Sequence, residues 1–210
     1  MPRATIDRFE QRKLTRAKLI DAALKLFSTS GYEHATVDDI SREAGYSKGA
    51  YYFHFSTKDD ILTELLRMWT EDRATVLAAS DGEASSADGL RDVLASFFTY
   101  EEKRWPAVLL EFWSQALRND EVSKRISQAY GSWRGQLAAA FEQAASASAI
   151  TVDSTQDAAA VALAAHDGFA VQVAITPAGA RAPMTAEALA ESIVAPLSGV
   201  RAASRRRAVR

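Results

Sequence analysis

The chain has 210 residues, of which 48% are hydrophobic and 25% charged, and its formal net charge at pH 7 is -2. This length and composition are typical of a soluble globular protein with one sizeable core, or with a small domain and a larger one. Because the net charge is close to zero, any nucleic-acid-binding surface must be a local basic patch. The sequence contains no cysteine, which excludes disulfides, a thiol redox switch and a Cys-ligated zinc, and fits a reducing cytoplasm.

The N-terminal part of the chain carries the start and stop signals of several consecutive helices. The first helix is expected to open near Asp7 and to cover at least residues 17–28, where apolar residues recur at intervals of three and four. Gly31 follows as a C-terminal stop. Two capping boxes, each a threonine followed three residues later by an aspartate, predict helices that begin after Thr36 and Thr57.

A tight turn lies between these two capping boxes. Gly45 ends the short helix that precedes the turn, and Ser47 caps the next helix, expected over residues 48–53. Two helices joined so tightly are typical of a helix-turn-helix, whose second helix enters the DNA major groove. Gly49 lets the backbone of that helix approach the bases, and Lys48 can reach a guanine edge or a phosphate.

A dense aromatic cluster ends the predicted reading helix. Tyr52 and His54 carry polar tips suited to phosphate, while Phe53 or Phe55 can fill the small core between the helices. Lys58 falls in the first turn of the next helix, where exposed backbone amides already favour an anion. The plainer alternative is that the tyrosine only fills the core and that the histidine is an ordinary surface residue.

The rest of the chain is predicted to be helical as well, because it is rich in alanine and shows almost no strand-like alternation. Polar loops at 81–88, 146–155 and 176–184 separate the apolar segments. Helices are expected over 58–80, 90–104, 106–117, 120–146, 157–175 and 185–201. We therefore predict an all-α protein with a helix-turn-helix domain at 1–60, a larger helical domain at 61–201 and a basic, disordered tail at 202–210.

Two segments resemble a known family. Residues 36–62, TVDDISREAGYSKGAYYFHFSTKDDIL, are similar to the signature of the tetracycline-repressor (TetR) family, and residues 20–32, IDAALKLFSTSGY, resemble its first helix. The close resemblance covers residues 13–66, and its long ordered pattern is far more specific than helix-turn-helix spacing alone. It implies a homodimeric DNA-binding transcriptional regulator, usually a repressor, with two half-sites in a palindromic operator and an all-α, ligand-binding C-terminal domain.

The resemblance also implies which residues contact double-stranded DNA. A tyrosine at position 51 departs from the family, which usually has an aliphatic residue there, so the base preference at that position is open. The residues before Arg16 resemble the basic arm that some members lay in the minor groove; they are Arg3, Arg8, Arg12 and Lys13. The expected DNA-binding residues are Thr36, Ser47, Lys48, Gly49, Tyr51, Tyr52, His54 and Lys58.

The helix predicted at 157–175 is apolar on nearly its whole circumference, so it must be covered on all sides. His166, Asp167 and Gln172 interrupt it, and we interpret it as a buried helix with no membrane partner. One face can meet a second copy, together with the last helix. The residues expected at this dimer interface are Val161, Ala165, Gly168, Gln172 and Ile193.

The many aromatic residues of the larger domain favour a pocket for a small apolar or aromatic effector, with a cationic ligand as a further option. The alternative is that these aromatics are only core. The expected ligand-binding residues are Phe98, Glu111, Phe112, Trp113, Gln115, Tyr130, Trp133, His166 and Phe169. No cofactor and no metal are expected.

Other functions remain as alternatives: a regulator without an effector, an activator, and a haem sensor that uses His166. An enzyme is the least favoured, because the adjacent His166 and Asp167 point about 100° apart on a helix and make a poor catalytic pair. The sequence also has no glycine-rich phosphate loop, metal-ligand spacing or nucleophile elbow. The arginine-rich tail could bind DNA, but it is more typical of a solubilising segment.

Overall fold

The computed structural model describes residues 8–80, 82–99, 104–177, 180–181 and 184–207, with side chains up to residue 198. Over that part of the chain the backbone forms nine helices and no strand, so the all-α prediction is confirmed. Arg3 of the expected basic arm lies outside the described residues, as does Asp7, where the first helix is expected to begin.

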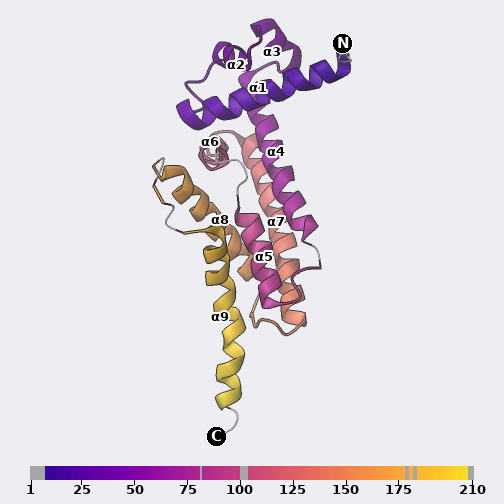
Figure 1. The fold of residues 1–210 in the computed structure, drawn as a ribbon, viewed down its shortest axis with the longest axis vertical. Helices are drawn as coiled ribbons and strands as arrows, with labels where there is room; N and C mark the ends of the chain where they lie inside the picture. Colours follow the sequence, from indigo (N-terminus) through magenta and orange to yellow (C-terminus); the bar gives the residue numbers. More distant parts are fainter. Residues whose placement is uncertain (1–7, 81, 100–103, 178–179, 182–183, 208–210) are drawn as a thin grey trace, which may run out of the picture.

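Three helices form the N-terminal unit: α1 (Arg8–Ser30), α2 (Val37–Ala44) and α3 (Lys48–His54). In Figure 1, α2 and α3 lie on the side of α1 that faces away from the rest of the molecule. The long helix α4 (Lys58–Ala79) leads from this unit into the C-terminal domain. This arrangement leaves the outer surfaces of α2 and α3 open to a large partner.

The local signals that start and end these helices are present as predicted. The Thr36 hydroxyl accepts a hydrogen bond from the Asp39 amide at 3.1 Å, and the Thr57 hydroxyl accepts one from the Asp60 amide at 3.1 Å. Gly45 ends α2 with a φ of 75°, a left-handed conformation that glycine adopts at little cost. The turn between α2 and α3 is therefore fixed by local chemistry.

The C-terminal domain contains the remaining helices, which are α5 (Ala87–Phe98), α6 (Trp105–Ala116), α7 (Asp120–Ser146), α8 (Thr155–Ile175) and α9 (Ala186–Arg207). The helix expected over 90–104 ends earlier, because the backbone of Thr99 is extended. Conversely, α9 continues through Arg207, so the tail predicted as disordered from residue 202 is helical up to that residue. Alanine and arginine are good helix formers, which accounts for the continuation.

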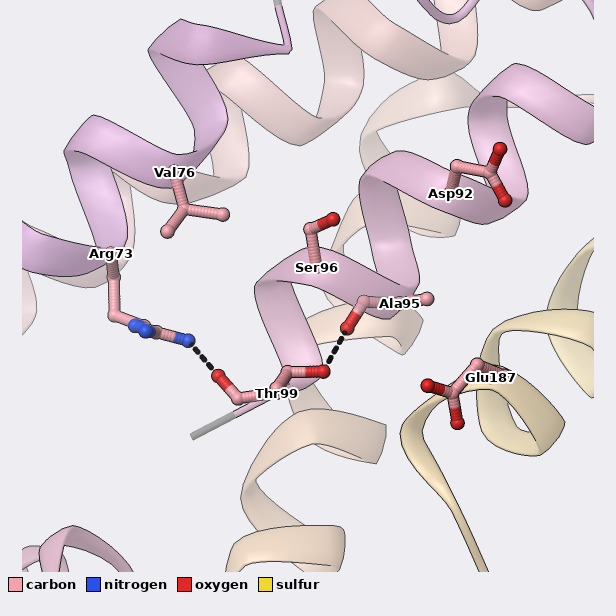
Figure 2. A pocket seen from close by; sticks show the side chains of 7 residues that line it. All are labelled: Arg73, Val76, Asp92, Ala95, Ser96, Thr99 and Glu187. Carbon is pink, nitrogen blue, oxygen red and sulfur yellow. Dashed lines mark hydrogen bonds between the residues drawn. The ribbon is translucent and has the colours of Figure 1, made fainter. Parts of the chain in front are cut away.

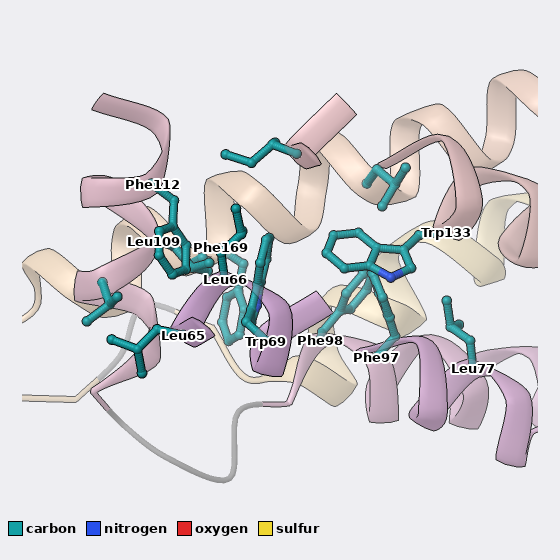
Figure 3. Close-up of a cluster of buried hydrophobic side chains, with 14 of the residues drawn as sticks. Leu65, Leu66, Trp69, Leu77, Phe97, Phe98, Leu109, Phe112, Trp133 and Phe169 are labelled. Carbon is teal, nitrogen blue, oxygen red and sulfur yellow. The ribbon is translucent and has the colours of Figure 1, made fainter. Parts of the chain in front are cut away.

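Aromatic side chains from several helices meet in the core of this domain (Figure 3). The rings of Trp69 on α4 and Trp133 on α7 are nearly perpendicular, with centroids 4.8 Å apart. Phe97 on α5 packs edge-on against Trp133, and Phe112 on α6 lies 6.0 Å from Trp69. Since α4 contributes to this cluster and begins beside α3, it connects the core with the N-terminal unit.

Helix α8 is the one described helix whose length and apolar composition would suffice to cross a membrane. One side of it packs in the domain core, where Leu163, His166 and Phe169 are buried. Its other side is open, with Val161 60% and Ile175 68% exposed. The sequence predicts that α8 is covered on all sides, but within a single chain only one side of it is covered.

Candidate nucleic-acid interface

Helix α3 presents an exposed polar surface that begins at its N-terminus. The Ser47 hydroxyl caps the helix by accepting the Ala50 amide hydrogen at 3.2 Å, and Lys48 and Gly49 follow in exposed positions. Tyr52, one turn after Lys48, is 51% exposed. Thr36 is also exposed, at the start of α2, which packs against α3. The structure thus places these five predicted DNA-binding residues on the surface of one pair of adjacent helices.

Lys48 is paired with an acidic residue of the neighbouring helix. Its ammonium nitrogen lies 3.0 Å from Oδ1 of Asp38 in the first turn of α2. The hydrogen bond and the negative charge of Asp38 raise the pKa of Lys48. Sequence reasoning missed Asp38, although its place beside the turn marks it as a neighbour of the reading helix.

The prediction that Tyr51 contacts DNA is wrong. Its side chain is fully buried, and its hydroxyl donates a hydrogen bond to the Thr57 carbonyl at 2.8 Å. Burial also raises the pKa of this tyrosine. The residue fills the place that an aliphatic side chain would occupy in the core of the three-helix unit, together with Phe55, while Phe53 is 63% exposed. Of the two phenylalanines considered for the core, Phe55 is therefore the core residue.

His54 lies at the end of α3 and is half-buried. Burial, followed by the positive charges of Arg16 and Arg12, lowers its pKa. The imidazole is therefore neutral near pH 7, and in that form it has one N–H to donate. A phosphate oxygen placed beside it would accept that hydrogen and favour protonation.

Lys58 has a different environment from the one expected. Its ammonium donates hydrogen bonds to the backbone carbonyls of Tyr32, at 2.7 Å, and Glu33, at 3.4 Å, and lies 4.1 Å from the centre of the Tyr32 ring. The group thus ties the start of α4 to the turn after α1. The sequence alone does not reveal these partners because they lie 26 and 25 residues away.

Glu111 and Gln115, predicted as polar groups of a ligand pocket, face the N-terminal unit instead. The Gln115 amide donates to Oε1 of Glu33 at 3.3 Å. Oε1 of Glu111 lies so close to Gly31 that an added Cβ there would be 3.2 Å away. The reason is that α6 crosses α1, so its polar side meets the end of α1 while its apolar side enters the core.

Three other predicted ligand residues are joined in a chain of hydrogen bonds. The Trp113 indole donates to the Tyr130 hydroxyl at 3.1 Å, and Tyr130 donates to Oδ1 of Asp167 at 2.7 Å. Nδ1 of His166 lies 3.1 Å from the same oxygen. Burial lowers the pKa of His166, and Asp167 opposes this shift. Asp167 is the residue that sequence reasoning left out of the site.

The remaining predicted ligand residues belong to the aromatic core of the domain. Phe98, Phe112, Trp133 and Phe169 are all buried in the aromatic core. The ring of Phe97 lies 4.8 Å from that of His166. The Asp167 carboxylate, which is 27% exposed, therefore lies at the border of this core, in contact with Tyr130 and His166.

Several clefts lie on the outside of the described part of the C-terminal domain. One of about 420 Å³ lies between α4, α5 and the start of α9 (Figure 2), and the buried guanidinium of Arg73 forms part of its wall. That guanidinium donates to the carbonyls of Phe97, at 2.9 Å, and Thr99, at 2.6 Å. A groove of about 320 Å³ between α4 and α7 includes Trp133 among its lining residues. A third cleft, of about 370 Å³, lies between α4, α5 and α7, and Asp167 is not among the lining residues of these three clefts.

The expected dimer-interface residues are distributed over α8 and α9. Val161, Gly168 and Gln172 are exposed, whereas Ala165 and Ile193 are half-buried. A Cβ added at Gly168 would meet no atom within 4 Å, so another helix can approach α8 closely there. The open side of α8 has the small and apolar residues that a helix-to-helix contact requires.

Two family models match the chain. The model described as "Bacterial regulatory proteins, tetR family" matches residues 19–65, which include α2, α3 and the start of α4. The model described as "BetI-type transcriptional repressor, C-terminal" matches residues 86–199. The second match covers more than half of the chain.

Named relatives carry the same type of description. The HTH-type transcriptional repressor Rv1474c of Mycobacterium tuberculosis is 33% identical over 140 residues, or 67% of each chain. The HTH-type regulator YwcC of Bacillus subtilis is 50% identical over 56 residues, 27% of this chain and 25% of that protein. The match to YwcC therefore spans about a quarter of that relative's length.

Solved structures share the fold over most of the chain. A regulator from Saccharomonospora viridis, solved in complex with choline, has a TM-score of 0.69 and 22% identity over 85% of this chain and 92% of that one. FadR from Bacillus subtilis, in complex with stearoyl-CoA, has a TM-score of 0.66 and 19% identity over 87% of this chain and 97% of that one. The chain belongs to the tetR family of bacterial transcriptional regulators, with a C-terminal domain of the BetI type.

Proposed function

We propose that this regulator is a cytoplasmic, homodimeric repressor that binds a palindromic operator through α3 and leaves it when a small molecule binds the C-terminal domain. The observation that carries the proposal is the exposed surface of Lys48, Gly49 and Tyr52 on a helix capped by Ser47. Cationic and hydroxyl groups beside a glycine backbone suit base edges and phosphates of a major groove.

Dimerisation is proposed through the open side of α8. An exposed valine and isoleucine at the two ends of that side, with Gly168 between them, leave apolar surface that a second copy would cover. A two-fold dimer presents two identical reading helices, and these suit two inverted half-sites. In this proposal the apolar helix packs against its partner copy rather than in a membrane.

A small cation is the effector class that the C-terminal core supports best. Asp167 supplies one negative charge, the Tyr130 hydroxyl donates to it, and the Trp113 indole donates to that hydroxyl. Aromatic faces and a carboxylate together bind ammonium groups. The choline complex of the Saccharomonospora regulator supports this class for a protein of the same fold.

DNA binding is tested with the duplex most enriched from a pool of random sequences by the wild-type chain, read by fluorescence anisotropy. Lys48→Ala and Tyr52→Phe should each weaken binding by about tenfold, because each removes a contact to a phosphate or base. Arg134→Gln, an exposed arginine of α7, serves as the control and should bind like the wild type. Equal affinity for the selected duplex and a scrambled one would contradict the proposal.

The effector is tested by thermal unfolding with choline as the probe. A ligand that binds only the folded state raises the melting temperature, and a hundredfold excess over its Kd adds about 2.7 kcal/mol of stability. Asp167→Asn should remove the response while the variant stays folded. An unchanged response in that variant would show that Asp167 does not hold the cation. A DNA-binding wild type without any response would favour the alternative of a regulator that does not respond to this class.

A further inference from the structure

Phe53 is the most exposed aromatic residue of the reading helix. It is 63% exposed, although it follows the buried Tyr51 by only two positions. Phe53 lies four residues after Gly49, so the two residues share one face of α3. This exposed ring lies beside the proposed DNA-binding surface, where a bound duplex would cover it.

A cationic side chain from another helix lies over the Phe53 ring. The guanidinium carbon of Arg12, on α1, lies 5.1 Å from the centre of the Phe53 ring. The ring of His54 meets Phe53 edge-on, with centroids 5.1 Å apart. These contacts bring Arg12, which the sequence assigned to a basic arm, onto the end of the reading helix.

The charge of Arg12 is available to an anion. Within the described residues no carboxylate pairs with Arg12, whereas the neighbouring Arg16 pairs with Glu64 at 2.9 Å and Lys13 pairs with Glu10 at 3.3 Å. A guanidinium that lies on an aromatic face keeps its N–H groups directed outward in its own plane. That geometry suits two oxygens of one phosphate.

We propose that Phe53 is a positioning residue for DNA binding, whose ring holds the guanidinium of Arg12 against a backbone phosphate beside α3. The occupant of this site is the DNA duplex, because the site continues the exposed surface of Lys48 and Tyr52 and its charge is positive. The proposal rests on the function proposed above and adds a phosphate contact that the helix-turn-helix pattern does not include.

The test is a double-mutant cycle on the selected duplex, measured over a salt series. Arg12→Gln should weaken binding about tenfold and reduce the slope of log affinity against log salt by about 0.9, the value for one lost phosphate contact. Phe53→Ala should weaken binding about threefold and also lower the slope, because the unsupported arginine contacts phosphate less often. Phe53→Tyr keeps the ring and should restore both values.

The double variant should bind no more weakly than Arg12→Gln alone, because Phe53 acts through the arginine. Circular dichroism and thermal unfolding of each variant confirm that the fold is intact, and Arg134→Gln reports the effect of losing a distant charge. The proposal would be overturned if Phe53→Ala left the salt slope unchanged. It would also be overturned if Phe53→Ala weakened DNA binding equally in the wild type and in the Arg12→Gln variant. If the wild type enriches no DNA sequence, both the proposed function and this inference fail. If Arg12→Gln weakens binding but Phe53→Ala binds like the wild type, this inference alone fails.

Discussion

The ammonium nitrogen of Lys48 lies 3.0 Å from Oδ1 of Asp38, so the first residue of α3 is paired with the first turn of α2. Both side chains are more than half exposed, and an exposed ion pair of this kind contributes little to stability. We expect the pair to have a larger effect on DNA binding, because Asp38 would compete with a phosphate for the Lys48 ammonium and would repel that phosphate.

Replacement of Asp38 by asparagine should therefore strengthen DNA binding. We expect about a threefold to tenfold gain in affinity at low salt, with little change in melting temperature. The measurement is anisotropy with the selected duplex, and Asp153→Asn in the exposed α7–α8 loop removes the same charge elsewhere. Weaker binding by the Asp38 variant would show that the pair positions Lys48 for DNA rather than competing with it.

The two lysines predicted to contact DNA should differ in their salt dependence. Lys48→Met should reduce the salt slope by about one, as expected for a lost phosphate contact. Lys58→Met should leave the slope nearly unchanged and lower the melting temperature instead, because the ammonium of Lys58 donates to the carbonyls of Tyr32 and Glu33. A reduced slope for both variants would mean that Lys58 leaves these carbonyls when DNA binds.

Tyr51 and Tyr52 allow the same substitution at two adjacent positions. Tyr51→Phe should lower the free energy of unfolding by about 1 kcal/mol, because the Thr57 carbonyl loses its buried donor. It should leave DNA affinity unchanged. Tyr52→Phe should weaken DNA binding and leave the free energy of unfolding unchanged, since this hydroxyl is on the exposed side of α3. Chemical denaturation and anisotropy on both variants check the pair, and a loss of DNA affinity in the Tyr51 variant would contradict its assignment to the core.

Glu64 should make the fold sensitive to acid. Hydrogen bonds from Arg67 lower the pKa of Glu64 most, and a hydrogen bond from Arg16 lowers it further. Burial opposes this shift, and the resulting pKa is about 2. Because the folded pKa lies below the unfolded value, Glu64 stabilises the fold above about pH 4.5, and this contribution disappears as the pH falls towards 2. Its size is on the order of 2 kcal/mol, since the side chain is largely buried.

Thermal unfolding over this pH range provides the measurement. Glu64→Gln should be less stable than the wild type near neutral pH and should lose less stability on acidification. Glu71→Gln, which removes the more exposed carboxylate partner of Arg67, is the matched control and should have a smaller effect. Parallel pH profiles for the wild type and the Glu64 variant would refute the assignment.

The fold of the N-terminal unit was accessible from sequence because its signals are local. Thr36, Gly45, Ser47 and Thr57 act within four residues of their own positions, and each caps or ends a helix as predicted. The same holds for the exposed positions of α3, which follow from the helical period. Tyr51 is the exception, because a tyrosine in place of an aliphatic residue suggests a new DNA contact, whereas its hydroxyl donates to the Thr57 carbonyl within the core.

The C-terminal site depends on contacts between distant segments, which periodicity does not reveal. Asp167 meets Tyr130 across 37 residues, and Gln115 meets Glu33 across 82. Glu111 and Gln115 have the polar character of ligand groups, but their helix turns that side towards α1. Only the packing of whole helices decides which polar residue faces a pocket and which faces another domain.

Helix α4 is held by hydrogen bonds at several points, and two of them are the Thr57 carbonyl, which accepts from Tyr51, and Arg73, which donates to the carbonyls at the end of α5. At a rise of 1.5 Å per residue these points are about 24 Å apart, which makes the segment a lever with the reading helix fixed to its tip. A tilt of about 8° around Arg73 moves that tip by about 3.4 Å, the rise of one base pair. A shift at the end of α5 that tilted α4 by this amount would therefore move α3 by one base-pair step.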